Sequence, residues 1–456
     1  MLPHRCDTCG HRHWGISYMA VRSSIVRGGP IPSIIKRNTF LLAATQAFVG
    51  IGTQMVPTMG AIIITQMVGT AYLVGLAASI QNFSRFLIAY PIGWVADTLG
   101  RRVALWTGHV LSTVGALCIG TSVLWSSLAM FVIGMLLMGL GLGAGQQLRL
   151  AAADLFPPAR RAEGLGYVLT GSLVGALGGP VVISLAEQVS PSFSMDPLAL
   201  SWFLVPAVMI PSMLLVFGIR PDPREIANNL RQYYPDLKEE PRLRADAPSG
   251  TGPMVWLRHY PLRVAFVAGF AAQGTMTLMM AMTSLALAHH GHGLPMISLA
   301  VAMHVVGMYG LSLPIGRLTD RFGRRWMMMA GTWVSAVGGL FVSMGVDYWA
   351  ITLGTALVGV GWCCTNVAST ALIADLVPAS DRGRAIGTND SFANAGSIFL
   401  PLLGGPIVEL AGLPSLAIVS TGLLMIPLIM LVKLDDSRPA PIAVPVAGHQ
   451  APARAK

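Results

Sequence analysis

The chain has 456 residues, of which 54% are apolar and only 11% carry a charge. Soluble domains have about 25% charged residues, so this composition excludes one large soluble globule, and the apolar content excludes a disordered chain. The apolar residues gather in uncharged runs of about 20 residues, the length that crosses a hydrocarbon core of about 30 Å. A transmembrane β-barrel would show short alternating segments instead. The composition therefore predicts an all-α membrane protein.

Twelve transmembrane helices are expected, in two pseudo-symmetric halves of six. Their predicted starts are near Thr39, Ala71, Val103, Ser127, Gly164, Ala199, Arg263, Leu294, Trp326, Trp349, Ala385 and Leu413. The predicted organisation is a cytoplasmic tail (1–38), an N-terminal half (39–219), a cytoplasmic linker (220–260), a C-terminal half (261–433) and a disordered cytoplasmic tail (434–456). The linker is rich in proline and in charges of both signs, with one short helix expected around residues 225–232.

The net charge of +10 is distributed asymmetrically. Apart from Arg85, in the second span, the Lys and Arg residues fall in the tails and in the loops of one side. This bias follows the positive-inside rule, so it predicts a multi-pass protein of the bacterial inner membrane with both termini in the cytoplasm, and it argues against nucleic-acid binding. The sequence has no phosphate-binding glycine loop with lysine and no Ser/His/Asp grouping, so we expect neither an enzyme nor a permanently bound cofactor.

A twelve-residue motif occurs once in each half. PIGWVADTLGRR (91–102) and PIGRLTDRFGRR (314–325) are identical at seven of twelve positions. A second set of matches pairs Asp154, Pro157, Arg161 and Gly166 with Asp375, Pro378, Arg382 and Gly387. Two parallel repeats of six spans indicate a transporter with a site between its halves. The chain resembles the Major Facilitator Superfamily over nearly all of its length, and the doubled G-x-x-x-D-x-x-G-R-R loop is that superfamily's strongest signature.

These two loops are predicted to gate transport. The gating residues are Gly93, Asp97, Gly100, Arg101 and Arg102, and in the second half Gly316, Asp320, Gly323, Arg324 and Arg325. The first glycine of each loop allows close helix packing, and the aspartate can pair with arginine or with the positive end of another helix. The resemblance implies that this contact stabilises the outward-facing state and breaks when the halves rock.

Sulfur and imidazole groups suggest a soft-metal site in the second half. Span 7 contains Met276 and Met280, and span 8 contains His304 and Met308. A separation of four places each pair on one helical face. At 1.5 Å per residue, Met276 and His304 lie about 20 Å and 18 Å from the ends of their spans, near mid-bilayer. Thioether and imidazole ligands suit Cu(I), so these four residues are the predicted metal ligands.

The paired motifs in consecutive spans resemble those of the CcoA-type copper importers, a branch of the superfamily. The resemblance implies import of copper from the periplasm by alternating access for the assembly of haem–copper oxidases. Copper would be the transported substrate, and a cytoplasmic copper chaperone is a candidate partner. The wider family also contains riboflavin transporters, and the glycines of span 5 partly match an antiporter pattern. Uptake of riboflavin or another small organic solute, and drug-type proton antiport, therefore stay open as alternatives.

Several other residues are candidate auxiliary contacts or coupling groups. The auxiliary substrate or metal contacts are Met55, Met59, Arg85, His289, His290, His292, Cys6 and Cys9. Arg85 is expected to pair with a substrate anion, with Asp390 or with backbone carbonyls. The coupling candidates are His304, Arg149 and Asp390, since imidazole titrates near physiological pH and an intramembrane charge is costly unless it functions.

Overall fold

The computed structural model describes residues 30–68, 76–235, 252–291, 294–344, 347–412 and 414–434, which are nearly all helical. The N-terminal helices are α2 (Ser33–Val68), α3 (Leu76–Thr98), α4 (Arg101–Leu124), α5 (Leu128–Gly145), α6 (Gln147–Asp154), the 3₁₀ helix η2 (Pro158–Arg160), α7 (Arg161–Phe193) and α8 (Pro197–Gly218). The linker contains α9 (Pro223–Asn228), α10 (Leu230–Tyr233) and α11 (Pro253–Arg258). The C-terminal helices are α12 (Tyr260–His289), α13 (Leu294–Tyr309), α14 (Ser312–Phe322), α15 (Arg324–Met344), α16 (Tyr348–Leu376), α17 (Arg382–Ala411) and α18 (Ser415–Val432).

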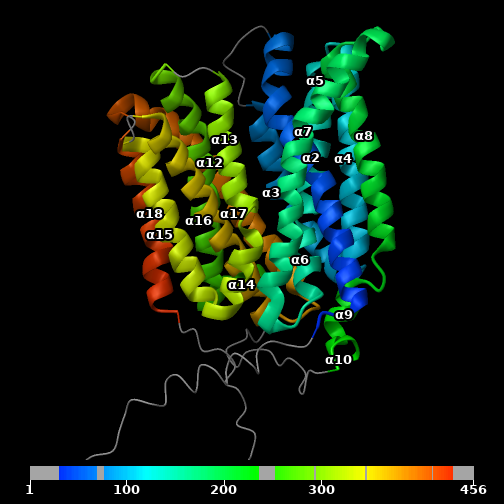
Figure 1. Cartoon of the computed structure of the whole chain (residues 1–456), viewed down its shortest axis with the longest axis vertical. Coiled ribbons are helices and arrows are strands. Elements are labelled where there is room, and N and C mark those ends of the chain that lie inside the picture. The colour runs from blue at the N-terminus through cyan, green and yellow to red at the C-terminus, as the bar shows by residue number, and fades with distance from the viewer. Residues whose placement is uncertain are drawn as a thin grey trace, which may run out of the picture.

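The helices form two upright bundles side by side, α2 to α8 and α12 to α18 (Figure 1). Each predicted span falls on one helix or on an adjoining pair, such as α5 with α6 and α13 with α14. Within the described ranges, nine helical stretches are long and apolar enough to cross a membrane. Helices α9 and α10 lie at one end of the bundles (Figure 1), which we call the linker face. The predicted all-α fold with two six-helix halves is therefore confirmed.

Aspartate side chains cap the N-termini of three helices. Asp196, Asp222 and Asp347 accept hydrogen bonds from the backbone N–H groups of residues 198, 224 and 350 at 2.7, 2.9 and 2.8 Å. Each bond satisfies one of the four N–H groups that a helix leaves unpaired at its start. The caps at Asp196 and Asp347 mark the starts of the apolar helices α8 and α16, whereas Asp222 caps α9 in the linker.

Glycine is required at the turn inside each repeated motif. Gly100 joins α3 to α4 with φ 103°, and Gly323 joins α14 to α15 with φ 107°. A side chain is strained at such positive φ values. The matching turns explain why the G-R-R part of the motif recurs in both halves.

The linker differs from its prediction in detail. The helix expected around residues 225–232 is two short helices, α9 and α10, which meet at Asn229 with φ −128° and ψ 41°. Helix α11 was not predicted. Outside the membrane spans, the Tyr234 hydroxyl donates to the carbonyl of Leu155 at 3.1 Å, and burial raises the pKa of this hydroxyl above its usual value. This contact fastens the start of the linker to the first half.

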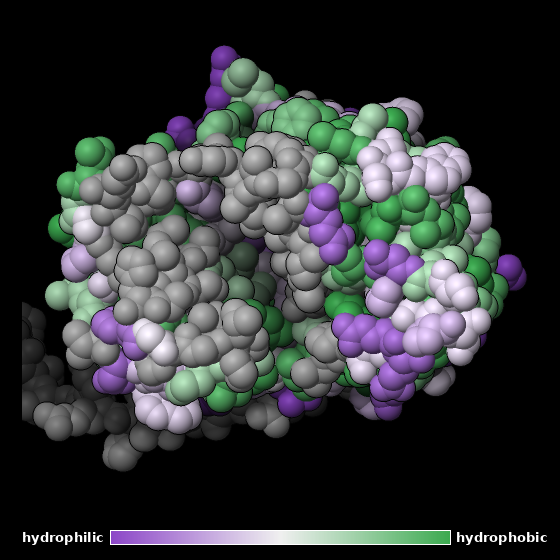
Figure 2. Space-filling view, turned by 90° about the horizontal axis from the view of Figure 1, so that it is seen from above, coloured by the Kyte–Doolittle hydropathy of each residue, from purple (hydrophilic) through white to green (hydrophobic). Residues whose placement is uncertain are grey.

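Two glycine seams join the halves near the linker face. A Cβ on Gly93 of α3 would lie 2.3 Å from the carbonyl oxygen of Gly383 in α17, and one on Gly316 of α14 would lie 2.2 Å from that of Ala162 in α7. Both distances are impossible for a real side chain, so the backbones touch. Seen from the end opposite the linker face, the molecule is hollowed between the two halves (Figure 2).

Candidate functional site: an inter-half lock and a polar cluster

The aspartate of the first repeated motif caps a helix of the other half. Asp97 accepts hydrogen bonds from the backbone N–H groups of Gly383 and Arg384 at the start of α17, both at 2.8 Å. Its carboxylate also binds the guanidinium of Arg101 at 2.7 Å, and both side chains are almost fully buried. A carboxylate at a helix N-terminus satisfies unpaired donors and interacts favourably with the helix dipole. The predicted pairing with a helix end is thus present.

The second motif makes the same contact in the opposite direction. Asp320 of the C-terminal half accepts from the N–H groups of Ala162 and Glu163, at 3.3 and 2.8 Å, at the start of α7. Its carboxylate lies 2.9 Å from Arg324. Each half therefore caps one helix of its partner half. We call these two reciprocal contacts the linker-face lock.

Two further aspartates extend the lock. Asp154 binds Arg101 of its own half at 2.8 Å and also binds Arg382 of the other half. Asp375 repeats this arrangement with Arg324 of its own half at 3.0 Å and Arg161 of the other at 2.6 Å. The sequence showed that these residues recur in both halves. It did not show that each aspartate bridges the halves, because spacing along the chain carries no information on contacts between bundles.

A second inter-half contact lies deeper in the molecule. Arg149 of α6 binds Asp390 of α17 at 2.6 Å and also donates to the side-chain oxygen of Asn366 in α16. Arg149 and Asp390 are 6% and 4% exposed. Both were predicted as coupling residues, and the structure brings them together. The partner of Asp390 is therefore Arg149. From the sequence, Asp390 was one possible partner of Arg85, and the structure does not form that pair.

Arg85 extends from α3 over Gly143 of α5, where an added Cβ would lie 3.2 Å from the Arg85 Cα. Its Nε and Nη2 groups are buried and have no hydrogen-bond partner in the part of the chain that the structure describes. Tyr309 of α13 lies within electrostatic range of both Arg85 and Arg149. The Tyr309 ring packs edge-on against Trp362 at a centroid distance of 6.0 Å. We call Arg85, Arg149, Tyr309, Trp362 and Asp390 the polar cluster.

One glutamine side chain holds a member of the polar cluster in place, and two others are buried without a described partner. The indole N–H of Trp362 donates to Gln273 of α12 at 2.5 Å, which fixes the orientation of the ring. The side-chain nitrogens of Gln81 and Gln147 are buried, and no partner for them occurs among the described residues. Buried polar groups without partners are rare and call for an explanation such as a ligand or bound water. Within the polar cluster itself, groups of Arg85, Arg149 and Asp390 are likewise buried without a partner among the described residues, so the cluster has unused hydrogen-bonding capacity there.

The predicted metal ligands have varied surroundings. His304 is 1% exposed, and its Nδ1 lies 2.7 Å from the carbonyl oxygen of Thr355 in α16. A carbonyl can only accept, so Nδ1 carries the proton and Nε2 keeps its lone pair. Nε2 is buried, with no partner within the described ranges. Met308 is 7% exposed, whereas Met276 and Met280 are half-buried. These observations place the four residues without testing whether copper binds them.

The auxiliary candidates are only partly described. Met59 is 2% exposed in α2, and His290 is exposed just after α12. Cys6, Cys9, His292 and the side chains of Met55 and His289 lie outside the described residues. Their predicted metal contacts stay predictions.

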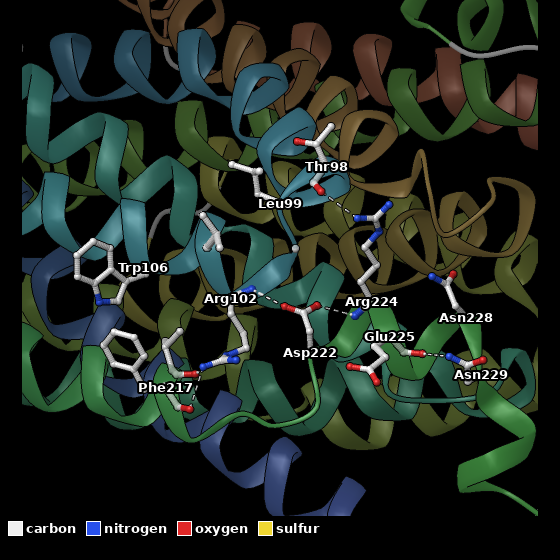
Figure 3. Close-up of a pocket in the computed structure, with 13 residues that line it drawn as sticks. Thr98, Leu99, Arg102, Trp106, Phe217, Asp222, Arg224, Glu225, Asn228 and Asn229 are labelled. Carbon is white, nitrogen blue, oxygen red and sulfur yellow. Dashed lines mark hydrogen bonds between the residues drawn. The ribbon is translucent and has the colours of Figure 1, made fainter.

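A separate cleft of about 770 Å³ lies at the linker face between the α3–α4 turn, α8 and α9 (Figure 3). Asp222 points into the turn and accepts from the backbone N–H groups of Arg101 and Arg102 at 3.2 and 3.0 Å. Arg102 donates to the carbonyl of Phe217 at 3.1 Å, and Arg224 donates to that of Thr98 at 3.2 Å. These hydrogen bonds attach the linker to the α3–α4 turn of the first repeated motif, and the cleft is distinct from the polar cluster.

Comparisons with known proteins agree with this architecture. Two curated relatives align with 87% of this chain. The uncharacterized MFS-type transporter YdeG of Bacillus subtilis is 27% identical and is covered over 92% of its length. The riboflavin transporter RfnT of Brucella anthropi is 24% identical and is covered over 96%.

Solved structures share the fold. The proton:xylose symporter XylE superimposes with a TM-score of 0.71 at 12% identity, covering 88% of this chain and 96% of that one. A bacterial homologue of the iron transporter ferroportin, in an outward-facing state, gives 0.64 at 15% identity, covering 87% and 98%. The family model described as the Major Facilitator Superfamily matches residues 42–280 and 264–455. The chain therefore belongs to the Major Facilitator Superfamily and is a membrane-embedded secondary transporter of a small solute.

Proposed function

We propose that the protein imports a small organic solute across the bacterial inner membrane by alternating access. The observation that carries this proposal is the linker-face lock, in which Asp97 and Asp320 each cap a helix of the opposite half. A lock at one end and a hollow at the other (Figure 2) describe one of the two states that a rocking transporter alternates between. The polar cluster lies between the halves, where such a carrier binds its cargo.

The orientation follows from charge. Lys and Arg concentrate in the loops of the linker side, and the positive-inside rule assigns that side to the cytoplasm. The lock then closes the cytoplasmic side, and the hollow faces the periplasm. This is the state in which an importer captures its substrate.

A flavin is the first solute to test. The riboflavin transporter of Brucella anthropi aligns with 87% of this chain. The polar cluster combines aromatic rings with unused hydrogen-bond donors, which suits a planar ring with carbonyl groups better than a bare metal ion. The relatives reported above give no support to copper import.

Copper import is a second candidate because of one observation. The Nε2 lone pair of His304 is buried and free of partners in the described structure, as a metal-ligating imidazole held by its other nitrogen would be. In this case Met276, Met280 and Met308 would be the sulfur ligands, and a cytoplasmic copper chaperone would receive the ion. Sulfur and imidazole are suitable ligands for Cu(I).

Uptake assays separate the candidates. Wild-type protein in proteoliposomes is supplied with radiolabelled riboflavin or radiolabelled copper, and Met308→Ala is compared with Met303→Ala. Both methionines are on α13, but Met308 is 7% exposed and Met303 is 42% exposed. Organic-solute import predicts riboflavin uptake that copper does not compete with. Copper accumulation that is lost in Met308→Ala and kept in Met303→Ala, without riboflavin uptake, would replace the proposal by copper import. Drug sensitivity on gene deletion, without either uptake, would favour efflux.

A further inference from the structure

We infer that Arg85, together with Tyr309 and Trp362, forms a recognition subsite for a planar aromatic substrate with an acceptor-rich edge. The edge would carry carbonyl oxygens or an anionic group, and Arg85 would donate its free N–H groups to it. This inference rests on the proposed transport of an organic solute and names the chemical class of that solute.

The first argument is the state of the Arg85 guanidinium. It lies inside the second span, and two of its N–H groups are buried without partners among the described residues. Arg149 differs, since its two Nη groups bind Asp390 and Asn366, although its Nε also has no partner among the described residues. Planar guanidinium groups pair with carboxylates and carbonyls through two parallel hydrogen bonds. Because Asp390 is already bound to Arg149, no described side chain supplies the acceptor for these N–H groups, and a ligand with carbonyl or carboxylate oxygens would supply it.

The second argument is charge. Arg85 and Arg149 contribute two positive charges to the polar cluster, and Asp390 contributes one negative charge, so the described groups leave a net +1 (2 − 1). An uncompensated cation inside a membrane is expensive and marks a substrate pathway. A cationic substrate would add to this excess. An anion or a ring with several carbonyl oxygens would reduce it.

The third argument is a pair of packed aromatic rings, of which Tyr309 is within electrostatic range of both arginines. Tyr309 and Trp362 pack edge-to-face at 6.0 Å, and the hydrogen bond from Trp362 to Gln273 holds this arrangement. Tyr309 is only half-buried and lies within electrostatic range of Arg85. Flat rings stack on such side chains with little loss of conformational freedom. Arginine within range of these rings therefore selects a flat molecule whose polar atoms lie along one edge.

Gly143 of α5 allows α3 to approach closely at Arg85. An added Cβ on Gly143 would meet Ile88 at 2.5 Å and the Arg85 Cα at 3.2 Å. Helices α3 and α5 therefore pack closely at Arg85, whose Cγ would lie 3.5 Å from that added Cβ, and the guanidinium is within electrostatic range of Tyr309 in the C-terminal half. Arg85 belongs to one half and its aromatic neighbours to the other, so a ligand bound between them contacts both halves.

The test measures binding by calorimetry to the purified full chain in lipid nanodiscs. Three planar probes are used: riboflavin, which has a carbonyl-bearing edge, orotate, which is an anion, and proflavine, a flat cation. We expect riboflavin or orotate to bind more tightly than proflavine. Arg85→Gln should weaken the favoured probe by about tenfold or more, since charge-assisted bonds are lost. Arg258→Gln, at an exposed linker arginine, should leave its affinity unchanged.

Each outcome decides a separate point. Preference for proflavine, no binding of riboflavin or orotate to folded wild type, or equal affinities of wild type and Arg85→Gln would overturn the inference. If Arg85→Gln does not fold, Arg85→Lys replaces it. Lysine keeps the charge but lacks the fork of donors, so affinity equal to wild type would also overturn the inference. Arg85-dependent binding without uptake by proteoliposomes would contradict the proposed transport and leave the subsite in place.

Discussion

Replacing Asp97 by asparagine should weaken the linker-face lock and open that side of the molecule. Asp97 accepts two backbone hydrogen bonds of 2.8 Å from the start of α17, and its charge strengthens both. Asparagine keeps one neutral acceptor and turns an N–H group toward the other donor. Charge-assisted bonds contribute about 1.5–3 kcal/mol each, so the loss should be roughly 2–4 kcal/mol. At 1.4 kcal/mol per tenfold change, the ratio of closed to open molecules should fall about 30- to 700-fold.

The distance between the halves at the linker face reports this shift. Spin labels can be placed at Leu99 and Phe322, which occupy equivalent positions in the two motifs and are 63% and 51% exposed, in a background where the native cysteines are replaced by serine. Pulsed electron paramagnetic resonance should show a new, longer distance population in Asp97→Asn. Asp196→Asn is the matched control, because Asp196 caps α8 within its own half. The reasoning is refuted if Asp97→Asn keeps the wild-type distances, or if Asp196→Asn lengthens them equally.

Four further substitutions, controls included, test the Gly93 seam and the deeper ion pair. Gly93→Ala would place a Cβ 2.3 Å from the Gly383 carbonyl, so overpacking of about 1–3 kcal/mol should disfavour the closed state in the same distance measurement. Gly422→Ala, where nothing lies within 4 Å, should leave the distances unchanged, and a shared effect would count against the seam. Asp390→Asn leaves the Arg149 charge buried without its partner, a cost of about 3–5 kcal/mol, and should lower the midpoint of thermal unfolding. Recovery of that midpoint on adding Arg149→Gln checks the pairing, since independent effects would simply add.

The sequence predicted the fold because it depends on local signals, whereas the contacts of Asp97 and Asp320 with helices of the opposite half were found only in the structure. Apolar runs define the helices, and the doubled motif places Asp97 and Asp320 at equivalent ends of two helices. For the Arg149–Asp390 contact, the sequence identified the two residues but not their pairing. Both residues stood out as costly charges in the membrane, but no spacing rule shows that α6 and α17 meet. The rotation of α13, which directs His304 toward Thr355, likewise depends on packing between helices that sequence periodicity does not specify.

The glycine seams have a consequence for how fast the halves can move. Where Gly93 meets Gly383 and Gly316 meets Ala162, main chain lies directly on main chain. Such surfaces have no interlocking side chains that must change rotamer before they separate. We expect the rate at which the two halves separate and close again at these seams to be limited by the hydrogen bonds and ion pairs of the linker-face lock. The carrier can then alternate between its states without repacking the side chains inside each half.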